Sequence, residues 1–290
     1  MKRKEFIKKA IIASTVGVAS PSVFASSTSS DPKEDLNKQI GFNHLPNKEI
    51  RTMKTVIHRS NTRGQANHGW LKANHSFSFA NYYNPDRMNF GVLRVLNDDQ
   101  IAPGMGFGTH PHNNMEIITI PLSGQVEHKD SMGNSGIINP GEIQVMSAGT
   151  GIQHSEYNKN KDQDLKLLQI WVIPNKQQVT PRYDQLEINK ANSVNGFKQI
   201  LSPNESDNGV WIHQNAWFHL GELNANETFL YSVKDSKNGV YAFIIEGESE
   251  IQDQNLSARD GMGIWDTNEI KIKSKAKSKI LLMEVPMQLN

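Results

Sequence analysis

From Met53 onward the chain alternates short apolar runs with polar turn segments. The runs are rich in β-branched and aromatic residues, and clusters of Gly, Pro, Asn and Asp separate them, as is typical of strands and turns. The clearest runs are residues 92–96, 116–120, 167–173 and 241–245. No segment keeps the helical period of apolar residues over several turns. The pattern predicts an all-β fold, either a β-sandwich or a barrel.

The second half of the chain repeats the order of elements found in the first half. Residues 122–127 (LSGQVE) are echoed by residues 245–250 (IEGESE), and each is followed by a turn with Asp or Asn and then by a strand that starts with Gly. Coincidence among short strand–turn units is the alternative, but the shared order favours two related barrels in tandem. We expect a first barrel over residues 53–174, a connection over 175–210 and a second barrel over 211–290.

Composition narrows the kinds of site that the chain can hold. It has no Cys, which excludes disulfides, thiolate nucleophiles and Cys-ligated zinc or iron–sulfur centres. Any metal must therefore be held by imidazole and oxygen. Without residues 1–25 the chain has 26 basic and 29 acidic residues, a net charge of −3. Such a body gives no electrostatic reason to expect nucleic acid as a partner.

The first 25 residues have the features of an export signal. Basic residues precede an apolar run at 10–19 and small residues up to Ala25. The stretch 3–8 (RKEFIK) resembles a twin-arginine motif with Lys in place of the second Arg, so ordinary secretion stays open. An uncleaved anchor is less favoured, because the apolar run is shorter than the ~20 residues of a membrane span. We expect export, to the periplasm, with residues 26–52 as a flexible leader.

Two pairs of polar residues carry the candidate chemistry. His110 and His112 are two residues apart, and His154 and Glu156 repeat that spacing after a Gly-rich turn. Residues at i and i+2 on a strand project from the same face. Pro111 lacks an N–H, so its strand cannot be bonded on both sides there. If the two pairs face one another across a barrel, three nitrogens and one carboxylate oxygen form a site for a first-row metal ion.

A longer stretch of sequence around these pairs resembles the pirin family. The resemblance rests on four stretches: 110–116 (HPHNNME), 127–131 (EHKDS), 146–152 (MSAGTGI) and 154–156 (HSE). It extends from about Thr55 to Pro286 and is similar in particular to the bacterial pirin-like quercetin dioxygenases. It implies a bicupin, that is, two tandem jelly-roll-like cupin barrels with a metal site in the first barrel only.

Carried over by position, the resemblance assigns the ligands of one divalent metal ion to His110, His112, His154 and Glu156. Iron is the favoured ion, and copper, nickel, manganese or zinc also suit this ligand set. General cupins use a carboxylate at the position of Glu116, whereas the pirin pattern uses Glu156. Glu116 is therefore a candidate for steering an imidazole from behind, with a solvated strand carboxylate as the alternative.

Other histidines and aromatic residues receive weaker assignments. The second barrel has no His-x-His, and His213 and His219 are six residues apart, so we expect no second metal site. His128 is expected at a polar strand position, and no role is assigned to His58, His68 and His75, which lie in an N-terminal stretch. Four phenylalanines either line an apolar pocket for a flat aromatic ligand or pack in the core. They are Phe77, Phe79, Phe90 and Phe107.

The resemblance implies a metal-dependent dioxygenase that opens the ring of a flavonol-like enol with O2. Glu156 is expected both to bind the metal and to accept the substrate proton. Two alternatives stay open: a metal-binding redox sensor that acts through partner proteins, and a cupin that holds metal without turnover. No nucleic acid and no stable membrane span are expected, while the native metal, the substrate and the oligomeric state are left open by the sequence.

Overall fold

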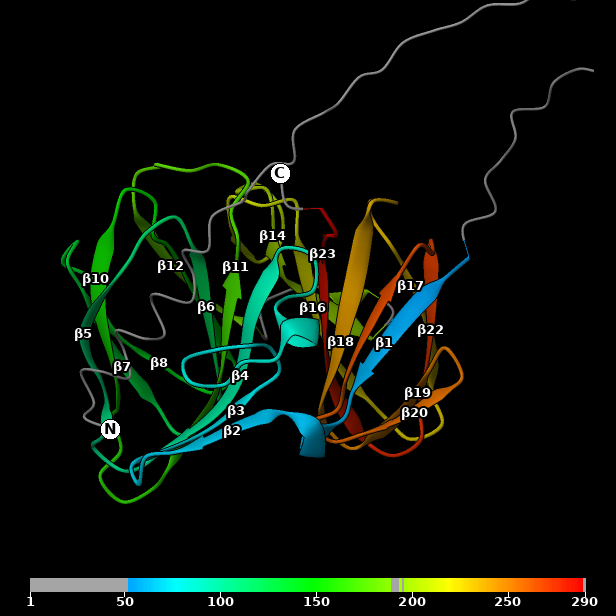
Figure 1. The fold of residues 1–290 in the computed structure, drawn as a ribbon, viewed down its shortest axis with the longest axis horizontal. Helices are drawn as coiled ribbons and strands as arrows, with labels where there is room; N and C mark the ends of the chain where they lie inside the picture. The colour runs from blue at the N-terminus through cyan, green and yellow to red at the C-terminus, as the bar shows by residue number, and fades with distance from the viewer. Residues whose placement is uncertain (1–51, 189–192, 195, 289–290) are drawn as a thin grey trace, which may run out of the picture.

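In the part of the chain that the structure describes, nearly all regular secondary structure is β-strand, as the alternation of apolar runs and turn residues predicts. The computed structural model describes residues 52–188, 193–194 and 196–288. Two 3₁₀ turns interrupt the strands, η1 (Ser60–Thr62) and η2 (Pro85–Arg87). Each half of the chain forms a domain in which a large sheet faces a small one (Figure 1).

The first domain pairs a seven-stranded sheet with a four-stranded one. The large sheet runs in the order β12 (Arg182–Glu187), β9 (Glu142–Ser147), β6 (Glu116–Ser123), β11 (Leu165–Val172), β4 (Leu93–Ile101), β3 (Leu71–His75) and β2 (Gly64–Asn67). The small sheet runs in the order β5 (Gly106–His112), β10 (Ile152–Asn158), β7 (Val126–Asp130) and β8 (Ser135–Ile138). All pairings within these two sheets are antiparallel.

The second domain has the same plan. Its large sheet runs in the order β1 (Lys54–His58), β21 (Gly261–Trp265), β18 (Asn238–Glu246), β23 (Ser278–Pro286), β16 (Trp217–Leu223), β14 (Phe197–Ser202) and β13 (Ser193–Val194), and β15 (Val210–Trp211) pairs with β14. Its small sheet runs in the order β17 (Thr228–Ser232), β22 (Glu269–Ser274), β19 (Glu248–Ile251) and β20 (Gln254–Ser257). The sequence repeat falls at matching places, because Gly124 and Gly247 both turn the chain from the large sheet into the small one with positive φ.

Three apolar cores hold the layers together. One lies between the two sheets of the first domain and one between those of the second. The third joins the domains, since the two large sheets pack back to back through residues such as Ile118 and Leu168 on one side and Phe218, Tyr241 and Phe243 on the other. In Figure 1 the four sheets accordingly follow one another from left to right. The molecule is thus one stack of four sheets with three cores.

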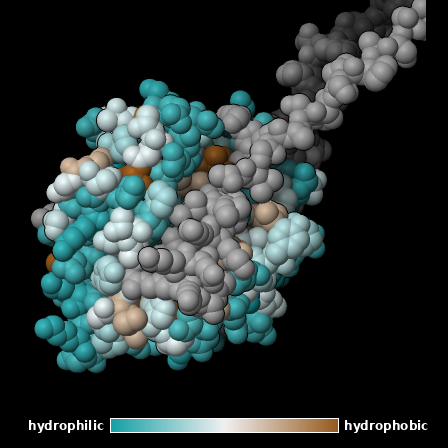
Figure 2. Space-filling model, turned by 60° about the vertical axis from the view of Figure 1, so that its left-hand side comes forward, coloured by the Kyte–Doolittle hydropathy of each residue, from teal (hydrophilic) through white to brown (hydrophobic). Residues whose placement is uncertain are grey.

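The fold class predicted from the sequence, all-β with two tandem cupin domains, is confirmed. The sheets of each domain are not joined into a closed barrel, so each cupin is a pair of facing sheets. The face shown in Figure 2 is mainly hydrophilic, with apolar residues scattered singly. Among the residues that the structure describes, no helix is long and apolar enough to cross a membrane.

The strand pairing differs from the predicted domain boundaries in two places. β1, placed by the sequence in the first barrel, pairs with β21 of the second domain. β12, placed in the connection 175–210, pairs with β9 and belongs to the first domain. Both exchanges extend a sheet edge with a distant strand, and no local pattern encodes that choice. The predicted export signal and nearly all of the predicted leader lie in residues 1–51, outside the described residues.

Candidate metal centre

Strands β5 and β10 bring the two predicted pairs together. They pair antiparallel, with His154 directly opposite His110. The register shifts between His154 and Glu156, so a local bulge re-aims the second pair, a device common beside functional sites. β5 is the edge strand of the small sheet, which agrees with the expectation that Pro111 excludes bonding on both sides.

The three imidazoles form a tight cluster in the interior of the first domain. Ring centroids are 4.4 Å apart for His110 and His154, and 4.9 Å apart both for His110 and His112 and for His112 and His154. One ring nitrogen from each residue lies within 4.8 Å of the others. Three nitrogens at this separation suit one shared first-row ion. The i and i+2 spacing therefore places His110 and His112 on the same face of their strand, as the sequence predicted.

A sharp turn sets the position of β10 before its ligand residues. Gly149 has φ +47°, and a Cβ there would lie 1.9 Å from the carbonyl oxygen of Val179. Neither the backbone angle nor this close approach suits a residue with a side chain. The Asn114 N–H donates to the Gly149 carbonyl, and the Thr150 N–H donates to that of Val179. The Gly-rich turn thus fixes where β10 begins.

Protonation of the histidines favours metal binding. His110 Nδ1 lies 2.8 Å from the Gly108 carbonyl, which can only accept, so Nδ1 carries the proton and Nε2 remains as a ligand atom. Burial, followed by the nearby imidazoles, holds the pKa of His154 well below its usual range. Burial does the same for the pKa of His112, with His110 as the second cause. His112 and His154 are therefore held in the neutral form that binds metals.

His154 supplies the clearest sign that an ion belongs here. Its side chain is almost completely buried, and both ring nitrogens lack a hydrogen-bond partner among the described residues. Such buried polar atoms are costly unless something binds them. Because one ring nitrogen from each histidine converges on a common point and His154 has no other partner there, the residues present fit a divalent metal ion.

Glu156 lies in the same pocket but is held by the large sheet. Thr119 Oγ1 donates to its Oε1 and Gln169 Nε2 donates to its Oε2, both at 2.9 Å. Burial raises the pKa of Glu156, and these two hydrogen bonds oppose the rise. Each carboxylate oxygen keeps a lone pair for an ion. The assignment of Glu156 as the fourth ligand therefore stays a prediction, and Thr119 and Gln169 are partners that the sequence did not reveal.

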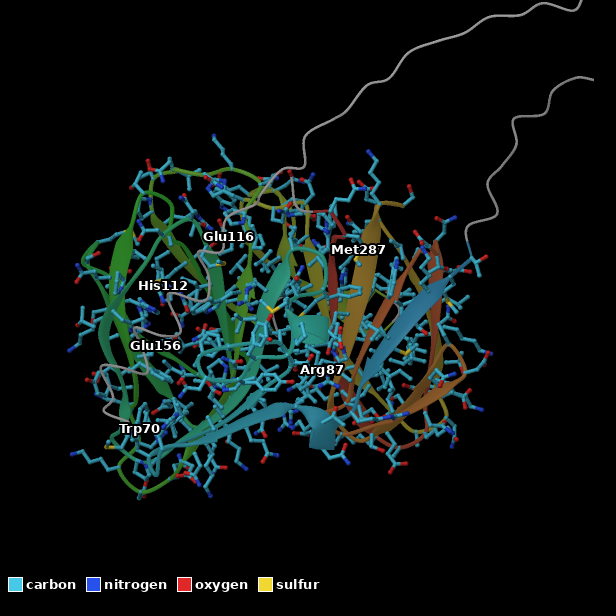
Figure 3. All side chains as sticks on the ribbon, viewed as in Figure 1. Trp70, Arg87, His112, Glu116, Glu156 and Met287 are labelled. Carbon is cyan, nitrogen blue, oxygen red and sulfur yellow. The ribbon has the colours of Figure 1, made fainter. Side chains whose placement is uncertain are left out.

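Glu116 lies on the other side of the large sheet. On β6 it alternates with Ile117, which lines the pocket, so its side chain is on the face that packs against the second domain. Ser147 Oγ donates to Glu116 Oε2 at 2.7 Å, and the backbone N–H of His213 also donates to it. Figure 3 shows His112 and Glu156 within the first domain and Glu116 apart from them. The prediction that Glu116 steers an imidazole is not supported by these contacts.

A pocket opens beside the histidines, between the two sheets. Its apolar lining includes Phe79, Phe107, Ile117 and Trp171. Two of the four phenylalanines proposed for a pocket are thus in it, whereas Phe77 and Phe90 pack in the core between the domains. Its polar lining comes from the large sheet, at His75, Asn97, Asp99 and Gln169. Sequence reasoning did not place these four residues in the pocket. The signal for two of them is the polar run at residues 97–100 inside a strand with apolar ends, of which Asn97 and Asp99 line the pocket.

The matching region of the second domain is apolar. β22 occupies the place of β10, and its inward residues are Ile270 and Ile272, both in the core of that domain. His219 is buried there, 3.2 Å from the Tyr231 hydroxyl, while His213 lies near Trp211 outside this core.

In the first domain His128 is fully buried beside Met146 rather than at a polar strand position.

Comparison with known proteins agrees with this architecture: a bicupin with a histidine cluster in its first domain. The family model "Pirin" matches residues 56–172, and the model "Quercetinase C-terminal cupin domain" matches residues 199–285. The chain belongs to the pirin family.

Individual relatives cover most of the chain. It is 44% identical to a quercetin 2,3-dioxygenase of Escherichia coli over 230 residues, which are 79% of this chain and 98% of that one. It is 40% identical to a pirin-like protein of Caulobacter vibrioides, over 76% of this chain and 95% of that one. The crystal structure of the bacterial pirin YhhW from Escherichia coli in complex with nickel(II) matches with a TM-score of 0.76 and 42% identity, covering 80% of this chain and 99% of that one.

Proposed function

We propose that the protein is a metal-dependent dioxygenase that cleaves the ring of a flavonol-like enol with O2. One observation carries the proposal: three converging imidazoles and Glu156 line a pocket that also has aromatic residues in its wall. Relatives named quercetin 2,3-dioxygenase, several of them only putatively, support the same reaction class. An aromatic pocket beside a metal suits a flat ring with oxygen substituents.

The residues divide the work between binding and proton handling. His110, His112 and His154 would hold the ion, with Glu156 as the fourth ligand. A bound divalent ion supplies Lewis acidity toward an enol oxygen and a redox centre for O2. A Glu156 oxygen accepts the enol proton, because a buried carboxylate beside the substrate is within reach to act as a base. Gln169 and Thr119 keep that carboxylate aimed into the pocket.

We propose iron as the native ion, with copper, nickel, manganese and zinc as the competitors. Three imidazoles and a carboxylate suit all of them, and the relative from Escherichia coli was crystallised with nickel(II). Metal analysis of protein purified from its native compartment tests the identity directly. Zinc as the sole metal would contradict the proposal, because zinc has no redox chemistry to offer O2.

The test of activity is oxygen consumption with quercetin as substrate. Protein loaded with iron, copper, nickel or manganese should consume O2 and remove the flavonol absorbance. His110→Ala should lose metal and activity together while the sheets stay folded, because His110 lies at the partly exposed edge of the cluster. His213→Ala, a partly exposed histidine outside the pocket, is the matched control and should keep both. If the protein consumes no O2 with any of these metals, a binding or sensing role would be favoured over dioxygenase activity.

We further propose that the protein is exported. The support is the sequence of residues 1–25, with a basic start, an apolar run and small residues before Ser26. Cell fractionation followed by N-terminal sequencing tests it: mature protein should begin near Ser26 in the periplasm. Cytoplasmic protein with Met1 intact would contradict export.

A further inference from the structure

The pocket holds a second set of buried polar atoms outside the cluster of His110, His112 and His154. Three side chains from the large sheet line the pocket and are at least nine-tenths buried: His75 at 1% exposed, Asp99 at 5% and Trp171 at 5%. His75 Nε2, Asp99 Oδ1 and Trp171 Nε1 have no hydrogen-bond partner within the described part of the chain. Buried polar atoms in native proteins are rarely left unpaired, so a ligand that completes them is expected in this pocket.

Two of these side chains, Trp171 and His75, belong to a row of ring contacts that starts at the histidine cluster. Trp171 packs edge-on against His112, with ring centroids 4.9 Å apart. Phe79 follows at 5.3 Å from Trp171, and His75 at 5.3 Å from Phe79. Trp171 therefore lies beside the histidine cluster, whereas His75 is three ring contacts away from His112. The two polar atoms meet different ends of a molecule lying along this wall.

Trp171 Nε1 and His75 Nε2 have opposite hydrogen-bonding roles. The Trp171 Nε1–H can only donate, so it suits an oxygen with a free lone pair. His75 Nδ1 lies 2.8 Å from Asn97 Oδ1, and that oxygen only accepts, so Nδ1 carries the proton. Burial keeps the pKa of His75 below its usual value, so the ring is neutral and Nε2 is an acceptor. His75 Nε2 therefore suits a hydroxyl group that donates.

We propose that Trp171 and His75 form a recognition wall that selects aromatic enols carrying a hydroxyl group at the end remote from the metal. Trp171 donates to an oxygen beside the metal-bound position, and His75 accepts from the remote hydroxyl. Asn97 acts as a positioning residue, since it fixes the tautomer of His75. The inference rests on the proposed function for its substrate class, but ligand binding can be tested without turnover.

The experiment compares two flavonols by calorimetry on the zinc-loaded protein, because zinc excludes redox turnover. Quercetin carries phenolic hydroxyls as well as the enol and ketone, whereas 3-hydroxyflavone carries only the enol and ketone. Wild type should bind quercetin more tightly than 3-hydroxyflavone. His75→Phe keeps a ring in the row and should weaken quercetin about tenfold while leaving 3-hydroxyflavone unchanged, the effect of one lost hydrogen bond.

Two more variants test separately how the two ends of the recognition wall contribute to binding. Trp171→Phe should weaken both compounds by a similar factor, because both keep the oxygens near the metal. Asn97→Leu leaves His75 in place but frees its tautomer, so it should lose part of the quercetin preference even if His75→Phe folds poorly. His219→Phe and Trp217→Phe, both in the second domain, are matched controls and should bind as wild type does. Circular dichroism and zinc content check each variant.

The experiments distinguish a failure of the proposed recognition wall from a failure of the proposed dioxygenase activity. Three results would contradict the proposed recognition wall. His75→Phe could lose affinity for both compounds equally, neither His75→Phe nor Asn97→Leu could lose affinity for quercetin, or wild type could fail to bind either compound. A quercetin preference that His75→Phe removes, in a protein whose iron-loaded form consumes no O2, would support the wall and overturn the dioxygenase.

Discussion

His110 and His154 stand directly opposite each other on β5 and β10, with ring centroids 4.4 Å apart. Strand pairing alone creates this contact, and the position of His112 two residues along adds the third ring. Without an ion, His154 is a buried imidazole whose two nitrogens have no hydrogen-bond partner among the described residues. The arrangement that favours metal binding therefore lowers the stability of the metal-free protein.

The first prediction follows from that cost. In the presence of a chelator, His154→Leu should be more stable than wild type by about 1–3 kcal/mol, because an unpaired buried polar group is replaced by an apolar one. With metal in thousandfold excess over its Kd, wild type should gain about 4 kcal/mol and the variant almost nothing. Thermal unfolding measures both. His219→Leu, which removes a histidine already partnered by Tyr231, should lower stability in both conditions.

The order of stabilities without metal decides the first prediction. A metal-free His154→Leu protein less stable than wild type would mean that the imidazole has a partner that the structure does not give it.

The second prediction concerns the two side chains that hold Glu156. Gln169→Leu and Thr119→Val each remove one hydrogen bond to its carboxylate, which frees the group to turn away from the histidines. Partners of this kind typically contribute ten- to a hundredfold to metal affinity, so we expect losses of about that size in competition with a chelator. Gln199→Leu, at a partly exposed position of the second domain, is the control, because it also removes one side-chain hydrogen bond. Unchanged affinity in both pocket variants would remove Glu156 from the ligand set.

The third prediction is a pH dependence centred on Glu116. Burial raises the pKa of Glu116 from 4.5 to about 7, with the Ser147 hydrogen bond and Arg182 opposing the rise. The folded state thus binds its proton more tightly than the unfolded state. Its contribution to stability is fully present below pH 4.5 and is lost as the pH rises toward 7. Glu116→Gln should therefore be more stable than wild type above pH 8, by about 2 to 3 kcal/mol.

Comparison of the two proteins isolates this group. Buried histidines such as His58, whose pKa burial lowers to about 4, change stability in both proteins alike as the pH falls below 6.5. The difference in free energy of unfolding between wild type and Glu116→Gln, measured with urea at several pH values, should shrink toward acid. A constant difference would show that Glu116 stays ionised in the folded state.

Local patterns predicted the histidine cluster and offered Phe79 and Phe107 for the pocket, but not the polar wall that the large sheet supplies. The His-x-His spacing and the edge position of Pro111 follow from strand geometry, which the sequence encodes directly. The sequence did not place His75, Asn97 or Trp171, because their role depends on which strands of the large sheet lie opposite β5 and β10. That relation arises from long-range pairing, which one sequence does not show.

The same limit explains why Glu116 faces away from the histidines and why two strands pair outside the predicted domain boundaries. Glu116 occupies the position of a ligand in general cupins, yet strand alternation turns it toward the second domain. β1 and β12 pair with strands more than thirty residues away. Hydrophobic patterning says that such strands exist, but not which edge they join.

The last prediction concerns the core shared by the domains. Tyr241 is completely buried between the large sheets, where it contacts Phe77 and Phe90 of the first domain and its hydroxyl lies 2.9 Å from His58 Nδ1. Because this core joins both domains and β1 crosses to the second sheet, the metal-free protein should unfold in one cooperative transition. Tyr241→Ala should lower stability by about 3–5 kcal/mol and shift that transition as a whole. Tyr83→Ala, at an exposed position, should leave it unchanged, and two separate transitions in calorimetry would show that the domains unfold independently.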